Sequence, residues 1–138
     1  MNKFILDSYV LMCLFDKKRQ KETRAVKKYF EDSENGKTAL YMSKINEGEV
    51  FYKLYKYLGS EFASGFRADV KRGLFPIQVV PVNDRRVEAA SEIKAGFNVS
   101  YADAFCIGLA KEMDLPVITG DPEFECVKNI IKVISLTV

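Results

Sequence analysis

The sequence predicts an α/β fold in which helices cover both faces of a parallel sheet. Strand and helix patterns alternate along the whole chain. The predicted strands are short and almost continuously apolar, which is typical of strands buried on both faces. No repeat, low-complexity tract or long linker divides the 138 residues, so we expect one domain spanning residues 1–138.

The first half of the chain should contain two strands and four helices. An apolar run predicts a strand at residues 4–6, followed by a helix over residues 8–15 and a second helix over residues 20–33, which Asn35 and Gly36 end. A second strand is expected at residues 38–42. Ser43 then caps a third helix that ends at Gly59, and a fourth helix runs from residue 60 to about residue 72.

The second half should add three strands and two helices. A third strand is predicted at residues 77–82, and Asn83 or Asp84 caps the helix that follows and ends at Gly96. Ser100 caps a helix over residues 101–113. Apolar runs at residues 116–119 and 130–136 complete a set of five strands.

The composition indicates a soluble protein whose chemistry depends on carboxylates. Apolar residues make up 48% of the chain and charged residues 29%, and no apolar stretch approaches the ~20 residues of a spanning helix, so we expect a cytoplasmic protein with no membrane segment. Cys13, Cys106 and Cys126 are widely spaced in apolar surroundings and are predicted to be core residues. The chain has no histidine, the commonest general base and zinc ligand.

Acidic residues follow two of the predicted strands. Asp7 comes directly after the first strand, and Asp121 follows the strand at residues 116–119. In open parallel sheets the ligand crevice lies outside the carboxyl ends of the strands, so the two side chains should face a common cleft. Asp103, in the first turn of its helix, could join them, as could Glu49. Converging carboxylates favour Mg²⁺ or Mn²⁺ and a phosphodiester hydrolysis that needs no histidine.

Each acid also has an ordinary structural explanation. Asp7 can cap a turn or helix, Asp103 can stabilise a helix dipole, and Asp121 before a proline is a common turn initiator. Glu47 and Glu49 point in nearly opposite directions on one helix, so only one of them can enter the cleft and the other should be solvated. Periodicity does not choose between them.

Four segments, in order along nearly the whole chain, carry a resemblance to a known family. They are residues 4–8 (FILDS), 42–52 (MSKINEGEVFY), 100–105 (SYADAF) and 119–124 (TGDPEF). With these segments the chain resembles PIN-domain ribonucleases of the VapC toxin type. The resemblance implies a three-layer α/β/α fold with five parallel strands in the order 3-2-1-4-5, a Mg²⁺- or Mn²⁺-dependent endoribonuclease, and a VapB-type antitoxin as partner.

The resemblance also implies the site residues. In that family the helical acid precedes a small apolar residue and an aromatic pair, which here matches Glu49 before Val50-Phe51-Tyr52. The implied metal-binding and catalytic set is therefore Asp7, Glu49, Asp103 and Asp121. Ser8 and Thr119 match positions where hydroxyls hold the neighbouring carboxylates in place. Glu123 is left open, as a peripheral ligand or a solvated turn residue.

Two surface features suggest macromolecular partners. The net charge of +2 comes from 21 basic and 19 acidic residues; with four carboxylates committed to a metal, 21 basic against 15 acidic residues leaves +6 for the rest. A basic cluster between the first two helices is the candidate RNA contact: Lys17, Lys18, Arg19 and Lys21. The third and fourth helices carry more aromatic side chains than one face can bury, which predicts a homodimer and an apolar antitoxin groove.

Two other functions stay open at this point. The chain could be a catalytically inactive interaction module on the same fold. It could also be a receiver-like phosphoacceptor domain, but that class expects paired acids after the first strand, whereas Leu6 precedes Asp7.

Overall fold

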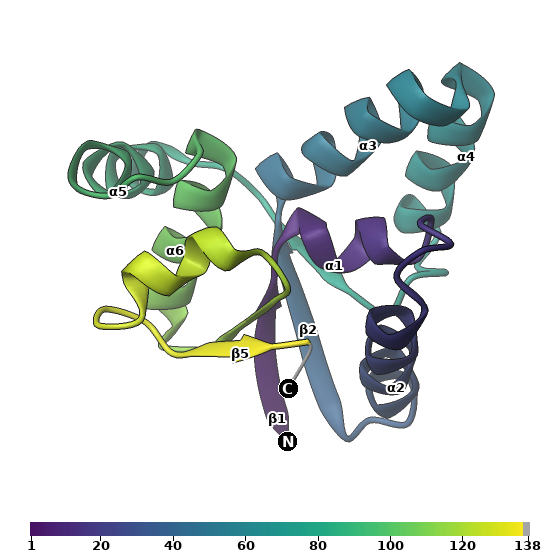
Figure 1. Cartoon of the computed structure of the whole chain (residues 1–138), viewed down its shortest axis with the longest axis horizontal. Helices are drawn as coiled ribbons and strands as arrows, with labels where there is room; N and C mark the ends of the chain where they lie inside the picture. The colour runs from purple at the N-terminus through teal and green to yellow at the C-terminus, as the bar shows by residue number, and fades with distance from the viewer. Residues whose placement is uncertain (137–138) are drawn as a thin grey trace.

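The fold is built on one parallel sheet, which the computed structural model describes within residues 1–136. All strand pairs are parallel and their order is β3-β2-β1-β4-β5, as predicted (Figure 1). The strands are β1 (Asn2–Leu6), β2 (Thr38–Ser43), β3 (Gln78–Val80), β4 (Val117–Thr119) and β5 (Val133–Ser135). The order reverses at β1, whose neighbours are β2 on one side and β4 on the other, and this is where a ligand crevice is expected.

Helices flank the sheet on both sides. They are α1 (Ser8–Cys13), α2 (Gln20–Glu34), α3 (Lys44–Leu58), α4 (Ser60–Lys71), α5 (Asp84–Gly96), α6 (Tyr101–Met113) and the short 3₁₀ helix η1 (Pro122–Val127). Side chains at the N-caps accept hydrogen bonds from the first turns of five of them: Asp7, Ser43, Asn83, Ser100 and Asp121. In Figure 1, α5 and α6 lie to one side of the sheet and α1 to α4 to the other.

The two faces of the sheet come from the alternation of side chains along each strand. Ile5 and Val117 are buried in one hydrophobic cluster, whereas Leu6 and Ile118, one residue further along, are buried in the other. The first cluster is completed by α5, α6 and η1, and the second by α1 to α4. A covered sheet of this kind explains why the strands are apolar without alternation.

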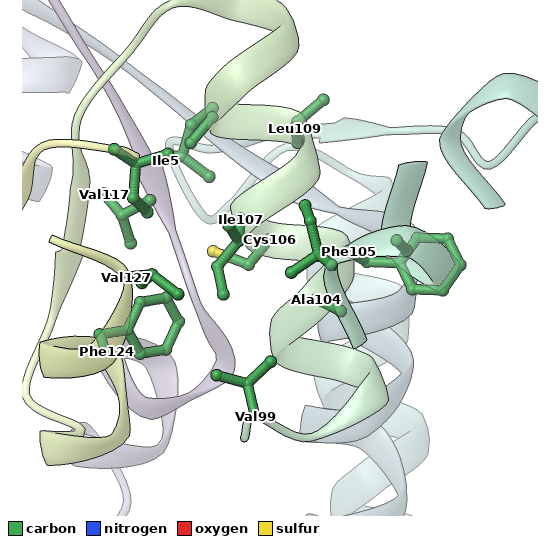
Figure 2. Packing of buried hydrophobic residues seen from close by; sticks show 14 residues of the cluster. Ile5, Val99, Ala104, Phe105, Cys106, Ile107, Leu109, Val117, Phe124 and Val127 are labelled. Carbon is green, nitrogen blue, oxygen red and sulfur yellow. The ribbon is translucent and has the colours of Figure 1, made fainter. Parts of the chain in front are cut away.

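Helix α6 is the most deeply buried helix of the first cluster. Its residues 103–110 are all buried, and Figure 2 shows Phe105, Cys106 and Ile107 in the same cluster as Phe124 and Val127 of η1. This packing fixes both the N-terminal end of α6 and the segment that follows β4. The two segments carry Asp103 and Asp121.

Several predicted helices and strands are longer than the observed ones. The first helix ends at Cys13, because the next residues form hydrogen bonds of the 3₁₀ type. The third strand stops before Pro81, which has no N–H to donate to a neighbouring strand. The predicted strand at 130–136 is only Val133–Ser135, and η1 was not expected. Cys13 and Cys106 are buried as predicted, but Cys126 is exposed on η1, so its assignment to the core was wrong.

In the described part of the chain, every helix falls short of the length and hydrophobicity needed to cross a membrane.

Candidate metal centre

Three carboxylates converge at the carboxyl edge of the sheet. Asp7 directly follows β1, Asp121 follows β4, and Asp103 lies in the first turn of α6. One oxygen of each lies within 4.8 Å of the others. The parallel pairing of Leu6 with Ile118 aligns the ends of β1 and β4, so residues more than a hundred positions apart in sequence meet at one point.

The hydroxyl of Thr119 connects the two strand-end acids. It donates to Asp7 Oδ2 at 2.6 Å and accepts from the backbone N–H of Asp121 at 2.9 Å. The other oxygen of Asp7, Oδ1, accepts from the N–H of Val10 at 3.3 Å and so caps α1. Asp7 is therefore both a helix cap and a member of the cluster, and Thr119 lies where the resemblance predicted a supporting hydroxyl.

Glu49 lies beside this cluster on the same cleft. The hydroxyl of Ser8 donates a hydrogen bond to Glu49 Oε1, and Lys53 Nζ lies 3.5 Å from its Oε2. Glu49, Asp103 and Asp121 all line the cleft, but Glu49 is outside the group whose oxygens fall within 4.8 Å of one another among the described residues. The structure therefore places the fourth predicted acid at the wall of the site.

Glu47 lies away from the cleft, but it is not solvated. Glu47 is only 3% exposed, and Lys44 Nζ contacts both of its carboxylate oxygens at 3.0 Å. The expectation of a solvated glutamate was wrong because Lys44, one helical turn earlier, covers and neutralises the carboxylate. Lys53 lies one helical turn after Glu49 and pairs with it in a similar way. This spacing is visible in the sequence, but the position of Lys53 on the cleft is not.

The environment of the cluster favours protons or a cation over free carboxylates. Burial raises the pKa of Asp7 to about 8; the nearby Asp103 and Asp121 add to this rise, and the hydrogen bonds from Thr119 and Val10 oppose it. The pKa of Asp103 is raised to about 7, mainly by burial and next by the nearby charge of Asp121. An oxygen-only donor set with these unfavourable charges suits a hard divalent cation.

The cleft around the cluster has a volume of about 570 Å³. Its acidic lining residues are Glu49, Asp103, Asp121 and Glu123. Its apolar lining includes Met12, Phe15, Leu54, Tyr57 and Leu58. Glu123 is exposed, and its carboxyl raises the pKa of Asp103 further.

The four predicted RNA-contacting residues do not act alike. Lys17 lines the cleft, whereas Lys18 and Lys21 are exposed beside it. Arg19 also lines the cleft, but its guanidinium lies 3.0 Å from Glu22 and 3.1 Å from Asp16. Its charge is therefore largely compensated by these two carboxylates.

Gly120 is held in a tight cradle between the two cluster residues Thr119 and Asp121. A Cβ atom at this position would overlap Cε1 of Tyr9 and Oε2 of Glu22. Arg19 hydrogen-bonds to both Tyr9 and Glu22 and lies over the Tyr9 ring. The turn that carries Asp121 thus leans on a hydrogen-bonded wall that only a glycine can approach so closely.

Comparison with known proteins gives a family and a fold. The family model of the PIN domain matches residues 4–130. The VapBC structure from Salmonella typhimurium, bound to DNA, superposes with a TM-score of 0.73 at 22% identity, covering 99% of each chain. VapC20 from Mycobacterium tuberculosis, a toxin that cleaves the sarcin-ricin loop, gives a TM-score of 0.71 at 16% identity, covering 90% of this chain and 94% of its own. No curated protein matches the sequence.

The raised pKa values predict how stability changes with pH when no metal is bound. The pKa of Asp7 rises from 3.8 to about 8 on folding, so the folded state holds more protons than the unfolded state between these values. The melting temperature in chelator should therefore fall as the pH rises from about 5 to about 8, and Asp7→Asn should flatten this slope. Magnesium should stabilise the protein most at high pH, where the carboxylates are charged. A metal-free melting temperature that rises with pH would contradict the cluster.

A second prediction concerns the cradle of Gly120. Gly120→Ala should destabilise the protein by about 1–3 kcal/mol, because the new methyl group overlaps Tyr9 and Glu22. It should also reduce the stabilisation by magnesium, since Asp121 is the next residue. Gly65→Ala is the matched control: Gly65 lies inside α4 with no atom within 4 Å of the new Cβ, so the variant should be as stable as wild type or more so. Equal melting temperatures for the two variants would refute the cradle.

Proposed function

The chain belongs to the PIN domain family, and on this premise we propose that it is a divalent-metal-dependent endoribonuclease and the toxin of a VapBC-type pair. One observation carries the proposal. Asp7, Asp103 and Asp121, brought together from three elements, place a carboxylate oxygen each within 4.8 Å of the others at the reversal point of a parallel sheet. Burying these carboxylates beside one another costs stability, and such unfavourable groupings of charge are concentrated at functional sites.

The donor set fits Mg²⁺ or Mn²⁺. Asp7, Asp103 and Asp121 would hold the ion, with Glu49 at the wall of the same cleft. When bound, such an ion supplies an activated water and charge stabilisation at a phosphodiester. Because the sequence has no histidine, acid–base chemistry in the cleft falls to its carboxylates, lysines and tyrosines.

The surrounding residues orient these acids. The hydroxyl of Thr119 orients the Asp7 carboxylate, and the hydroxyl of Ser8 orients that of Glu49. Lys53 neutralises part of the charge of Glu49 and presents a cation at the cleft. Lys17 is free to contact a phosphate of the RNA at the same rim. The chain therefore offers anionic groups for a metal and cationic groups for the substrate backbone.

The two alternatives differ in what they require. The match to the PIN domain does not support a receiver-like phosphoacceptor. An inactive PIN-fold module remains the competing function, and the intact cluster with its supporting hydroxyls favours the enzyme. A cleavage assay separates them directly.

We propose a VapB-type antitoxin and a second copy of the chain as protein partners, acting in the cytoplasm. The two structural relatives described above include a VapBC complex and a VapC toxin. In this chain, large apolar side chains are exposed along α3 and α4, with exposed fractions from 45% to 77%: Tyr52, Tyr55, Tyr57, Leu58 and Phe62. Tyr57 and Leu58 also line the cleft, so an antitoxin segment lying on them would cover the acidic cluster.

The activity prediction uses the two neighbouring glutamates. Purified protein should cleave RNA in Mg²⁺ or Mn²⁺ and stop in excess chelator. Glu49→Gln and Asp103→Asn should each reduce cleavage by about 100-fold or more. Glu47→Gln is the control, because Glu47 points away from the cleft, and it should keep most of the activity. Cleavage that persists in chelator, or equal loss in Glu47→Gln and Glu49→Gln with both folded, would overturn the assignment.

The partner prediction is tested by mass and by a matched leucine pair. Light scattering of the isolated protein should give twice the 15.7 kDa of one chain. Leu58→Ala should weaken binding of a co-expressed VapB-type antitoxin about tenfold, whereas Leu74→Ala, equally conservative and also exposed, should not. A monomer mass would refute the dimer, and equal effects of the two variants would remove the cleft from the antitoxin interface.

A further inference from the structure

The loop between α1 and α2 and the first half of α2 carry a large excess of positive charge. Residues 17–28 contain seven basic residues and one acidic residue. Arg19 is paired with Asp16 and Glu22, and Lys28 lies 3.3 Å from Asp32. The five other basic residues of this segment make no ion pair within residues 1–136: Lys17, Lys18, Lys21, Arg24 and Lys27.

Some of these cations line a groove that lies next to the metal cleft. Gln20, Arg24 and Lys27, at helical spacing, lie on one face of α2 and form one wall together with Lys17. Leu14 and Phe15 also line the groove. Phe15, Asp16 and Lys17 line both this groove and the metal cleft, so the two hollows adjoin along these residues. We call this surface the basic groove; α2, which carries Gln20, Arg24 and Lys27, lies on the side of the sheet opposite α5 and α6 (Figure 1).

The acidic residue in the basic groove does not cancel its charge. One oxygen of Asp16 accepts from the backbone N–H of Lys18 at 3.0 Å, and the other accepts from Arg19 Nε at 3.1 Å. Both oxygens are thus used locally. Lys17, Arg24 and Lys27 are left as exposed cations on a common path, an arrangement that attracts a polyanion.

We propose that the basic groove binds the phosphate backbone of the RNA substrate on one side of the bond that is cleaved. The inference rests on the proposed endoribonuclease function and adds where the RNA strand runs. A strand whose scissile phosphate lies at Asp7, Asp103 and Asp121 passes Lys17 as it leaves the cleft and then reaches Arg24 and Lys27. The partly buried Phe15 offers an apolar surface for a base or ribose along this path.

An acidic polypeptide is the other polyanion that could lie in the groove. RNA is favoured because the groove adjoins the cleft that holds the carboxylate cluster, whereas the exposed apolar side chains suited to a protein partner lie on α3 and α4. Contacts to phosphates do not distinguish one base from another, so we expect these contacts to be independent of the RNA sequence. They should lower KM for long RNAs and leave the chemical step unchanged.

The test compares two double variants that remove the same charges. Arg24→Gln with Lys27→Gln alters the basic groove, and Arg85→Gln with Lys111→Gln removes one arginine and one lysine, both exposed, from α5 and α6 on the far side of the sheet. Cleavage is measured with manganese on a tetranucleotide and on a long single-stranded RNA. For the long RNA, the groove variant should show a KM raised about tenfold with unchanged kcat, while the tetranucleotide and the control variant behave as wild type.

Salt dependence gives a second, independent measure. Binding of fluorescein-labelled long RNA is followed by anisotropy in chelator at several salt concentrations. Loss of two phosphate contacts should make the slope of log K against log salt shallower by about 1.4, since each contact on a single strand contributes about 0.7. The control variant should keep the wild-type slope. Circular dichroism and melting curves establish that both variants are folded.

The outcomes separate this inference from the proposed function. If wild type cleaves neither RNA, the endoribonuclease proposal fails, and the anisotropy slopes still decide whether the groove holds RNA. If wild type cleaves both and the groove variant matches the control in KM and slope, the groove inference is overturned. It is also overturned if the groove variant binds RNA as wild type does but loses binding to poly-glutamate, because the groove would then be a protein-docking surface.

Discussion

The parallel pairing of β1 with β4 is the constraint on which the site depends. Leu6 pairs with Ile118, so Asp7 and Thr119 emerge side by side at the same edge of the sheet. The 2.6 Å hydrogen bond between them then fixes the carboxylate, and the same hydroxyl anchors the N–H of Asp121. A slip of one residue between these strands would turn the side chains of one strand to the wrong faces of the sheet and separate the acids. The site is therefore as well determined as the core beneath it.

The core and the site share their supports. Helix α6 is buried along residues 103–110, and this buried stretch begins with the cluster acid Asp103. Phe124, fully buried in the same hydrophobic cluster, fixes the segment that begins at Asp121. The apolar packing thus supplies the force that brings like charges together, and the raised pKa values of Asp7 and Asp103 reflect the opposing cost. This balance is the usual compromise between stability and function at an active site.

The sequence predicted the fold class and most elements because apolar runs and caps are local signals. The acids after β1 and β4 could be found in the same way, since each directly follows an apolar run that ends. The choice between Glu47 and Glu49 was beyond periodicity, because both glutamates are at least partly covered: one by Lys44, the other by Ser8 and Lys53. The family resemblance chose Glu49, which is the one that lines the cleft.

Other features depend on contacts that no local pattern encodes. The cradle of Gly120 joins residues from α1, α2 and the turn after β4, and the sequence did not indicate that Arg19, a predicted RNA contact, pairs with Glu22. The double attachment of Asp7 has a further, entropic consequence. With Oδ1 bound by Val10 and Oδ2 by Thr119, the side chain has already lost its torsional freedom when the protein folds. Capture of an ion then demands little further ordering of this ligand, so part of the ion's affinity is set in advance by the rigidity of the sheet edge.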